Sequence, residues 1–416
     1  MVLEVIMTVS AGNRVLMLLE NNPYPSDSRV RQEAKALVEA GFEVTVVSPK
    51  GRREGYHEVV DGVHVYRYPA PAEGNSFLGY LWEYGYSLLA AFGLSLVVFA
   101  RRGFDIIHAH NPPDLFVFIA IFYKLFGTRF VFDHHDLAPE NYHARFREGG
   151  SQLVYNILVW LEQLSCQVAD HVIATNESYK TIEMERGRVP EDQITIVRNG
   201  PDLDRLQLTD PDPELRRKAG TIIGFVGEMG PQDGLDYLLR ALRHLVYDLK
   251  RTDFYCVIIG TGSELANLKK LGTQLGLDDY VWFTGRISDE ALCQYLSTAD
   301  ICVSADPYNP FNDRCTMIKM MEYMTFGKPI VAFDLTEHRF TAQSAALYVP
   351  DNNELNYAQS LVQLMDDPQR RKMMGSFGRQ RIETELAWQY SVSNLLKAYH
   401  SLLPKTVQPG QEFVHP

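Results

Sequence analysis

The sequence predicts an α/β protein built from two Rossmann-like, doubly wound domains that face each other across a cleft. Short apolar runs alternate with longer helical patterns along the chain, which is typical of parallel sheets covered by helices on both faces. The length of 416 residues exceeds one typical domain. An Asp- and Pro-rich break at residues 199–213 divides the chain into halves of similar size, as a linker does. Such folds bind ligands at the carboxyl ends of their strands, so we expect the ligand site in the cleft.

In the first half, seven short apolar runs have the length and composition of strands. Segments with helical periodicity separate them. We expect strands at residues 15–19, 44–48, 63–68, 106–109, 130–133, 172–175 and 194–197, and helices at 29–40, 78–100, 115–126, 153–169 and 177–186. Residues 1–200 are therefore predicted to form the first domain, and residues 201–213 the linker.

The second half repeats this alternation over residues 214–385, which are predicted to form the second domain. Beyond residue 367 the pattern is helical up to residue 403, and the tail 404–416 is expected to be disordered. We expect strands at 222–226, 255–259, 281–284, 301–304, 330–333 and 347–349, and helices at 235–249, 264–275, 289–297, 317–326 and 353–365.

The charge balance argues against nucleic acid as the main partner. The formal net charge is −12, whereas binding to a phosphate backbone needs a basic face. Five cysteines without a CxxC spacing indicate a reduced, cytoplasmic protein. The first thirteen residues are apolar but short, and they lack a basic start, so a signal peptide is not expected.

Residues 84–100 contain no charged side chain and are close to the shortest length that spans a bilayer. Two glycines and two serines dilute this segment, and two arginines end it. We therefore expect a buried helix or a helix that docks at a membrane interface, in preference to a transmembrane helix. A peripheral position at the inner face of the membrane is thus an open alternative to a freely cytoplasmic protein.

Residues 309–334, NPFNDRCTMIKMMEYMTFGKPIVAFD, are the most informative segment and have the pattern of loop, helix, turn and strand. Asp313 or Thr316 is expected to cap the helix, and Gly327 to end it in a left-handed conformation. The helix N-terminus attracts anions, which predicts a phosphate site at this point of the chain.

Lys319 and Glu322 lie three residues apart in this segment and therefore share one face of the helix. Lys319 adds positive charge near the expected phosphate, and Glu322 can accept hydrogen bonds from sugar hydroxyls. A phosphate together with a hydroxyl-bearing sugar describes a nucleotide-sugar. The alternative is an ordinary surface ion pair between the two side chains.

Two glycine-rich turns follow predicted strands. Gly227 begins one, and Gly260-Thr261-Gly262 forms the other, so both can bring backbone N–H groups close to a phosphate. Leu265 occupies the third glycine position of a dinucleotide fingerprint, which disfavours NAD. Two Asp-x-Asp triplets, at 202–204 and 210–212, are interpreted as turn formers of the linker and not as ligands of a divalent metal.

Histidines end two predicted strands of the first half. His108 and His110 end one, and His134 and His135 end the other, beside Asp133 and Asp136. Because strand ends face the cleft, hydrogen-bonding or proton-handling roles are expected. A zinc or iron site is an alternative, but the spacing lacks a clear ligand pattern.

Arg29 is expected on the first turn of a helix that Ser28 can cap. A cation is unfavourable at a helix N-terminus unless an anion is nearby. Arg29 is therefore a candidate contact for an acceptor or a phosphate, and a solvated charge is the alternative.

Several segments together resemble the bacterial family 4 glycosyltransferases of the GT-B type over nearly the whole chain. VRNGPDLDRL resembles the segment at the domain crossover of this family. VGEMGPQDGLDYLLRAL resembles the first strand, loop and helix of its donor domain. MEYMTFGKPIVAFD resembles the family pattern EAMAxGxPVVA, and FDHHDLAPE resembles the strand that carries the active-site histidine.

The resemblance implies transfer of a sugar from a nucleoside diphosphate donor with retention at the anomeric carbon. It implies that Glu322 binds the donor ribose, that Gly227 approaches the phosphates, and that Gly262 and Arg286 lie near the base. It places His135 against the sugar or acceptor. It also implies that the last helix, residues 386–403, crosses back onto the first domain, and that no metal is required. With the residues inferred above, the expected donor site is Gly227, Gly262, Arg286, Asp313, Thr316, Lys319 and Glu322, and the acceptor side is Arg29, His110 and Asp136.

This chain also departs from the family pattern. Glu228-Met229 and Asp233-Gly234 stand where the family usually has an Arg and a Lys that clamp the phosphates, and the first glutamate of the usual E-x7-E pair is replaced by Arg314. Tyr24-Pro25-Ser26-Asp27 replaces the usual N-terminal Gly-Gly loop. We therefore expect Lys319, with help from Arg314 or Arg29, to supply the missing positive charge.

The sequence thus predicts a retaining glycosyltransferase that uses a UDP- or GDP-linked sugar and a cell-surface glycan or lipid-linked acceptor, without a further cofactor. Two alternatives stay open. One is a non-hydrolysing nucleotide-sugar epimerase of GT-B-like fold, and the other is a catalytically inactive scaffold that has lost the phosphate clamp.

Overall fold

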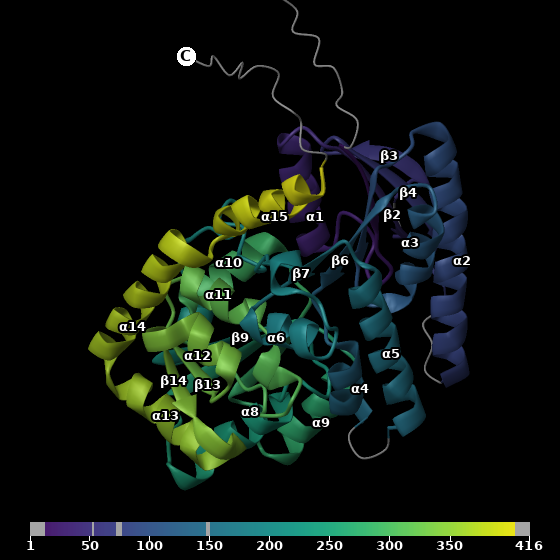
Figure 1. Cartoon of the computed structure of the whole chain (residues 1–416). Helices are drawn as coiled ribbons and strands as arrows, with labels where there is room; N and C mark the ends of the chain where they lie inside the picture. The colour runs from purple at the N-terminus through teal and green to yellow at the C-terminus, as the bar shows by residue number, and fades with distance from the viewer. Residues whose placement is uncertain (1–12, 52–53, 72–76, 147–149, 404–416) are drawn as a thin grey trace, which may run out of the picture.

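The computed structural model describes residues 13–51, 54–71, 77–146 and 150–403. Residues 1–12, where no signal peptide was expected, and the predicted C-terminal tail 404–416 lie outside these residues. Two sheets, each covered by helices, form two domains that contact each other along one side (Figure 1). The expected pair of doubly wound domains is confirmed.

The N-terminal sheet has eight strands among the described residues, in the order β3-β4-β2-β1-β5-β6-β7-β8. All neighbours are parallel except β3 and β4. The sequence missed β3, a half-exposed edge strand of sequence HEVV without an apolar run. The strands are β1 Arg14–Leu18, β2 Glu43–Lys50, β3 His57–Val60, β4 Val63–Pro69, β5 Ile106–His110, β6 Arg129–His134, β7 His171–Ala174 and β8 Ile194–Ile196.

Helices cover both faces of this sheet. Apolar side chains of α2, α3, α5 and α6 pack on one face, and those of α1 and the last helix, α15, pack on the other. The helix α4 follows β6 and was not expected. The bounds are α1 Ser28–Glu39, α2 Phe77–Arg101, α3 Val117–Lys124, α4 Ala138–Phe146, α5 Gln152–Val168, α6 Glu177–Glu185 and α15 Trp388–Leu402.

The C-terminal sheet is parallel throughout, in the order β11-β10-β9-β12-β13-β14. This order reverses between β9 and β12, which is where doubly wound sheets bind ligands. The strands are β9 Thr221–Val226, β10 Phe254–Ile259, β11 Val281–Gly285, β12 Ile301–Ser304, β13 Ile330–Phe333 and β14 Ala346–Val349.

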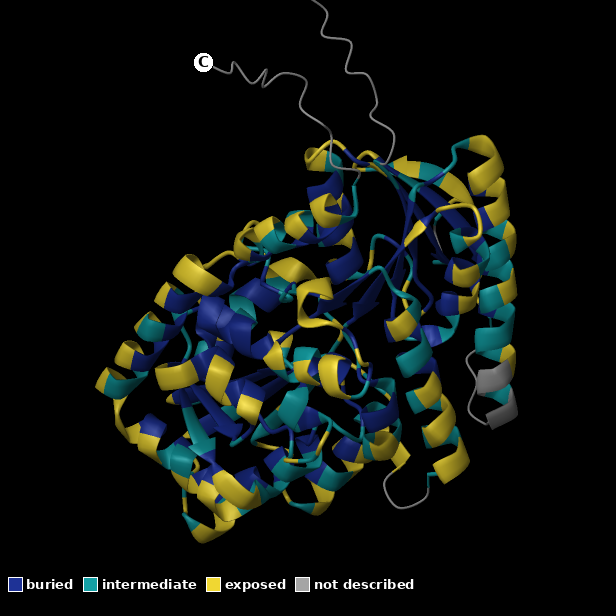
Figure 2. Ribbon diagram, viewed as in Figure 1, coloured by how far each residue is buried: buried dark blue, intermediate teal, exposed yellow. Residues whose placement is uncertain are grey.

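Apolar side chains of α8, α9 and α13 pack on one face of the second sheet, and those of α10, α11 and α12 pack on the other. Figure 2 shows that the strands are largely buried, whereas the helices around them carry most of the exposed residues. The short helices α7 and α12 were missed, because neither is long enough to show a period. The bounds are α7 Pro213–Arg216, α8 Leu235–Arg243, α9 Leu265–Gln274, α10 Asp289–Thr298, α11 Ile318–Thr325, α12 Thr336–Ala342, α13 Glu354–Asp366 and α14 Pro368–Arg381.

The chain crosses between the domains at two adjacent places, the loop after β8 and the junction before α15. The Trp388 N–H donates to the Pro201 carbonyl at 3.3 Å, so the two crossings touch. A Cβ on Gly200 would lie 2.5 Å from the Leu386 carbonyl oxygen, which requires glycine there. The helix α15 returns to the first domain as expected, where the Tyr399 hydroxyl lies 2.7 Å from His108 Nδ1.

The acidic triplets of the linker act as turn and cap formers, as expected. Asp202 accepts a hydrogen bond from the Asp204 N–H, and Asp212 caps α7 by accepting from the Leu215 N–H.

Candidate active site

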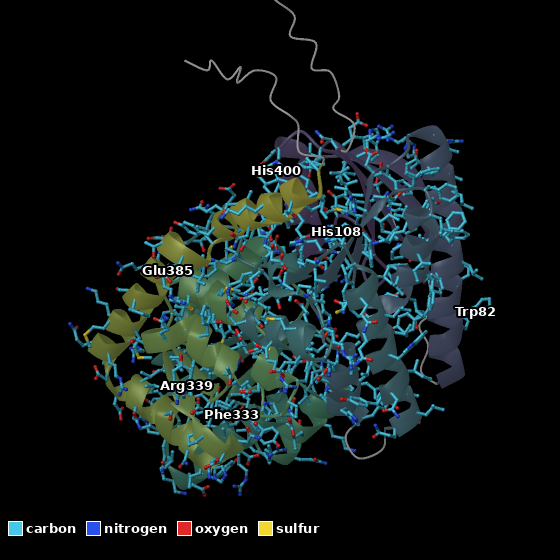
Figure 3. All side chains as sticks on the ribbon, viewed as in Figure 1. Trp82, His108, Phe333, Arg339, Glu385 and His400 are labelled. Carbon is cyan, nitrogen blue, oxygen red and sulfur yellow. The ribbon has the colours of Figure 1, made fainter. Side chains whose placement is uncertain are left out.

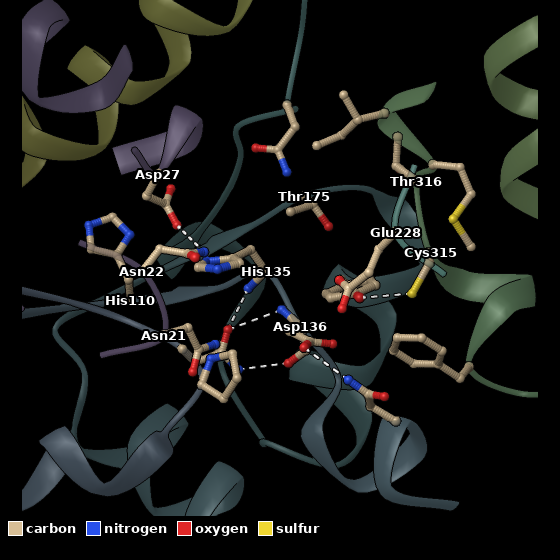
Figure 4. Close-up of a pocket in the computed structure, with 18 of the residues that line it drawn as sticks. Asn21, Asn22, Asp27, His110, His135, Asp136, Thr175, Glu228, Cys315 and Thr316 are labelled. Atoms are coloured by element: carbon tan, nitrogen blue, oxygen red, sulfur yellow. Dashed lines mark hydrogen bonds between the residues drawn. The ribbon is translucent and has the colours of Figure 1, made fainter. Parts of the chain in front are cut away.

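A cleft of about 360 Å³ lies between the domains, at the carboxyl ends of β1, β5, β6 and β7 on one side and of β9 and β12 on the other (Figure 4). Both sheets thus direct their strand ends at one cavity, as the topology requires. The lining residues used below are His110, Asn111, His135, Asp136, Glu228, Asp233, Thr316, Met317 and Ile318.

Two of the predicted histidines line this cleft. His110 is buried, and its Nδ1 lies 2.9 Å from Asp133 Oδ2, while its Nε2 has no hydrogen-bond partner among the described residues. Burial lowers the pKa of His110 and outweighs the opposing effect of Asp133. His110 is therefore neutral near pH 7, and if Nδ1 carries the proton toward Asp133, its Nε2 is free to accept a hydrogen bond.

Arg29 fixes Asp133 from the other side. Arg29 is 5% exposed, and its Nε and Nη2 donate to the two oxygens of Asp133 at 2.8 and 2.7 Å. Its Nη1 donates to the Val197 carbonyl at 3.0 Å. Burial raises the pKa of Asp133, but the Arg29 charge and the neighbouring histidines together outweigh burial, so the pKa of Asp133 falls well below its usual range.

The predicted roles of Arg29 are therefore wrong. Arg29 is neither solvated nor free to contact an acceptor or phosphate, because its donors are used by the protein itself. The capping prediction for Ser28 is also wrong, since Asp27 caps α1 by accepting from the Val30 N–H at 3.0 Å. The anion that balances Arg29 comes from β6, 104 residues away in sequence.

The same cluster contains the side chains that could hold a metal. Ligand atoms of Glu33, His108, His110 and Asp133 lie within 4.8 Å of one another, and all four residues are buried. Arg29 Nη2 lies 3.1 Å from Glu33 Oε1 and 2.7 Å from Asp133 Oδ1, so a guanidinium already balances both carboxylates. A metal cation there would have to displace this guanidinium.

His135 and Asp136 are held by Asn111, a residue that the sequence reasoning missed. Asn111 Oδ1 accepts from the backbone N–H groups of His135 and Asp136 at 2.8 and 3.0 Å, and its Nδ2 donates to the Asp136 carbonyl at 2.7 Å (Figure 4). Two prolines follow Asn111, and neither has an N–H group. An asparagine at a strand end before a Pro-Pro pair was the available signal.

His134 does not point into the cleft, although it precedes His135. It is buried between the carboxylates of Glu183, 3.2 Å from its Nδ1, and Glu162, 3.4 Å from its Nε2. Burial disfavours the imidazolium, but these two carboxylates outweigh burial and raise the pKa of His134 well above its usual value. His108 also lies away from the cleft, among the strands and against α15 (Figure 3).

On the donor side, the two glycine-rich turns pack against each other. The Gly227 N–H donates to the Ile259 carbonyl, and the Met229 N–H to the Thr261 carbonyl. A Cβ on Gly262 would lie 2.5 Å from the Met229 carbonyl oxygen, so the close approach of the turns requires glycine there. Gly227 has a φ of +155°, in the region that favours glycine. Arg286 is exposed in the loop after β11.

The helix α11 begins without a side-chain cap, so the predicted capping by Asp313 or Thr316 is wrong. Asp313 instead accepts from the N–H and hydroxyl of Thr336 at 2.8 and 3.1 Å. Thr316 Oγ1 accepts from Asn176 Nδ2 at 2.9 Å, which joins the two domains. Met317 and Ile318, at the start of α11, line the cleft. The helix N-terminus therefore faces the cavity with its first N–H groups uncapped.

Lys319 and Glu322 do not form the ion pair that was the alternative interpretation. Lys319 is 8% exposed, and its Nζ lies 2.7 Å from Asp306 Oδ1 and 5.0 Å from the centre of the Phe225 ring. Its Cδ would lie 3.9 Å from a Cβ on Gly227, so Lys319 supports the first glycine-rich turn. Glu322 lies 3.4 Å from Arg205 Nη2, and burial raises its pKa.

Among the described residues that line the cleft there is no lysine or arginine. Glu228 and Asp233, which stand at the usual clamp positions, both line it. Burial raises the pKa of Asp233 to about 6, and its Oδ2 accepts from the Gly230 N–H at 2.8 Å. Next to the first glycine-rich turn, positive charge comes from Lys319, just behind the turn, and from the start of α11.

Two protein-family models match the chain, one in each domain. The model described as a glycosyl transferase 4-like domain matches residues 26–200, and the model described as glycosyl transferases group 1 matches residues 220–367. An uncharacterized glycosyltransferase of Methanocaldococcus jannaschii is 22% identical over 82% of this chain and 86% of its own length. The alpha-maltose-1-phosphate synthase of Mycolicibacterium smegmatis is 23% identical over 67% of this chain and 74% of its own length.

Solved structures show the same fold. The sucrose-phosphate synthase of Thermosynechococcus elongatus superposes with a TM-score of 0.77 at 19% identity, over 94% of this chain and 99% of that one. The Anabaena protein HepE, in complex with UDP and glucose, superposes with a TM-score of 0.70 at 18% identity, over 93% and 99% of the two chains. The two domains, their facing strand ends and both family models lead to one assignment: this chain belongs to the family 4 glycosyltransferases, enzymes of the GT-B fold.

Proposed function

We propose that this enzyme moves a sugar from a UDP- or GDP-linked donor to a hydroxyl of a glycan or lipid-linked acceptor, with retention at the anomeric carbon and without a metal. The observation that carries the proposal is the uncapped start of α11, which opens into the same cleft that His110 and His135 line. A helix N-terminus suits a diphosphate, and the histidines opposite it suit sugar hydroxyls. HepE, whose structure holds UDP and glucose, has the same fold and supports this choice of donor.

The diphosphate is placed against Gly227 and the first N–H groups of α11. Lys319 lies behind this turn, and its charge is shared with Asp306. Glu322 is proposed to accept hydrogen bonds from the ribose, for which it would have to share its contact with Arg205. Gly262 and Arg286 lie at the adjacent turns, on the side proposed for the base.

In the transfer step, the bond between the anomeric carbon and the diphosphate oxygen breaks as the acceptor hydroxyl attacks from the same face. The departing diphosphate oxygen takes the hydroxyl proton, so no protein base is required. His135 is proposed to hydrogen-bond the reacting sugar, while His110 and Asp136 lie on the acceptor side of the same cavity. Closure of the cleft would exclude water, so that the acceptor competes successfully with hydrolysis.

Isothermal titration calorimetry with UDP, GDP and ADP tests the donor, followed by turnover of the matching sugar nucleotide with and without acceptor. We expect one nucleotide to bind and the sugar nucleotide to hydrolyse slowly when no acceptor is present. Conversion of the sugar to its epimer without an acceptor would instead identify an epimerase. Absence of binding by all three nucleotides would identify a scaffold.

A further inference from the structure

Three neighbouring helices on the outer side of the N-terminal domain expose large apolar side chains. The helices α2, α3 and α5 contain only two acidic residues, Glu83 and Glu162, and Glu162 is fully buried. The exposed fraction is 72% for Leu89, 80% for Leu125 and 52% for Trp160. Other exposed apolar side chains on or next to these helices are Trp82, Leu96, Val97, Phe99, Phe118, Ile121, Phe126, Leu153 and Ile157.

Ring contacts show that this surface is continuous, and we call it the α2–α3–α5 face. The rings of Phe99 and Phe126 lie 6.1 Å apart and join the carboxyl ends of α2 and α3. The rings of Phe118 and Trp160 lie 6.4 Å apart and join α3 to α5. Trp82 marks its outer edge in Figure 3. A continuous apolar face of this kind on a soluble domain indicates a binding surface.

The helix α2 is long and apolar enough to cross a membrane, yet its other side is part of the domain. Only 22% of its most apolar stretch is buried, so of the two expected alternatives, a buried helix and a helix that docks at a membrane interface, the structure excludes the first. Its two serines pack inward, where Ser87 Oγ donates to Glu20 at 3.1 Å and Ser95 Oγ lies 3.0 Å from the Tyr123 hydroxyl. Crossing a bilayer would expose these groups and uncover β2 and β4. The helix can therefore lie on a membrane but not span it.

Positive charge borders one end of the α2–α3–α5 face. Arg101 ends α2, Lys124 ends α3, and Arg129 follows closely, while Asp170 is paired with the last two. Tryptophan, phenylalanine and leucine with bordering cations are the composition of surfaces that dock on anionic lipid. The helix α4 connects this side to the cleft, since Asn141 lines the cleft and Phe146, five residues further on, is 46% exposed.

We propose that the α2–α3–α5 face docks on the surface of an anionic lipid bilayer, with its apolar side chains in the interface and without crossing the membrane. Because α4 connects this face to the cleft, docking would place the cleft close to the hydroxyls of lipid-linked acceptors. The inference concerns binding to lipid alone, so it holds or fails independently of the proposed sugar transfer.

Flotation with vesicles of phosphatidylcholine, with or without phosphatidylglycerol, tests the proposal. We expect the full chain to float with the phosphatidylglycerol vesicles and less with phosphatidylcholine alone. The double variant Leu89→Glu and Leu125→Glu removes two of the most exposed apolar side chains and should weaken vesicle partitioning by about tenfold or more. The matched control, Leu208→Glu with Met373→Glu, changes side chains that are 54% and 60% exposed outside this face and should float like the wild type.

Circular dichroism melting should show both double variants folded. Equal flotation of the variant and the control, or no flotation of the wild type on either vesicle, would overturn the proposal. So would resistance to alkaline carbonate extraction, which indicates a spanning helix. A dimer in light scattering that Leu89→Glu with Leu125→Glu dissociates, without vesicle binding, would assign the face to a second copy of the chain.

Discussion

The two sides of the cleft are built in opposite ways. On the N-terminal side, the groups that line or support the cleft are side chains held by buried partners, as in the series Arg29, Asp133 and His110. On the C-terminal side, where Glu228 and Asp233 also line the cleft, the groups proposed to bind the diphosphate are backbone groups of the first glycine-rich turn and the uncapped start of α11. Substitutions on the N-terminal side are expected to destabilise the fold strongly, because each buried charge is balanced by another. The C-terminal side requires only small residues in the turns and a helix N-terminus with free N–H groups.

Replacing Arg29 tests the N-terminal side most severely. Arg29→Met leaves Asp133 buried without its counter-charge, and we expect a loss of about 3–5 kcal/mol in the free energy of unfolding. Arg31→Met is the matched control, because Arg31 lies on the same helix and is exposed. Urea unfolding at pH 7 measures both. Equal, small losses would mean that the buried network contributes no more than a surface charge.

Lys319 supplies positive charge behind the first glycine-rich turn, and its effect on nucleotide binding can be separated from its effect on stability. Lys319→Met should weaken nucleoside diphosphate binding more than Glu322→Gln does, and should cost about 3 kcal/mol in stability because Asp306 is left unpaired. Adding Asp306→Asn should restore much of the stability. Calorimetry and urea unfolding of the three variants give both quantities. Recovery of binding together with stability would show that Lys319 supports the turn and does not act on the diphosphate.

These differences explain what the sequence could reveal. The strand ends, the glycine-rich turns and the helix of residues 317–326 depend on local periodicity and turn chemistry, and those predictions agree with the structure. The Asp133 carboxylate that accepts from Arg29 is 104 residues away in sequence. The Asp306 carboxylate that accepts from Lys319 lies in the loop after β12, before α11 begins. No local pattern encodes such pairs. For the same reason, the sequence could not predict that Asn111 holds the backbone of His135 and Asp136, or that the His134 side chain is buried between Glu162 and Glu183.

The sequence alone could not predict which side chains of α2 are exposed. Its composition fits a buried helix and an interfacial helix equally well, and only the packing of α3 and α5 beside it decides which faces stay uncovered. The structure therefore excludes the buried alternative for this helix and identifies a surface that three helices form together.

The two histidines that line the cleft test the N-terminal side through activity. His135→Ala should lower the rate of sugar transfer by about a hundredfold, within the range of a group that acts in the transition state, and should leave nucleotide affinity unchanged. His110→Ala should have an effect of similar size, because it lines the same cavity. His400→Ala is the control, since His400 is exposed on α15 and does not line the cleft. Single-turnover rates of the three variants, measured with the matched donor and acceptor, test this prediction. Unchanged turnover of His135→Ala would remove its proposed role.

The pH dependence of stability tests whether His134 is a charged structural element of the N-terminal side. Its pKa is raised in the folded state, because the carboxylates of Glu162 and Glu183 outweigh the effect of burial. Its charge therefore stabilises the fold fully below the unfolded pKa of about 6.5, and this contribution disappears as the pH rises through the folded pKa. We expect the stability advantage of the wild type over His134→Gln to shrink by up to about 1.4 kcal/mol per pH unit above pH 6.5. Urea unfolding between neutral and alkaline pH measures it, with the exposed His143→Gln as control. A constant difference between wild type and His134→Gln across this range would mean that His134 is neutral in the folded protein and that its two carboxylates share their proton instead.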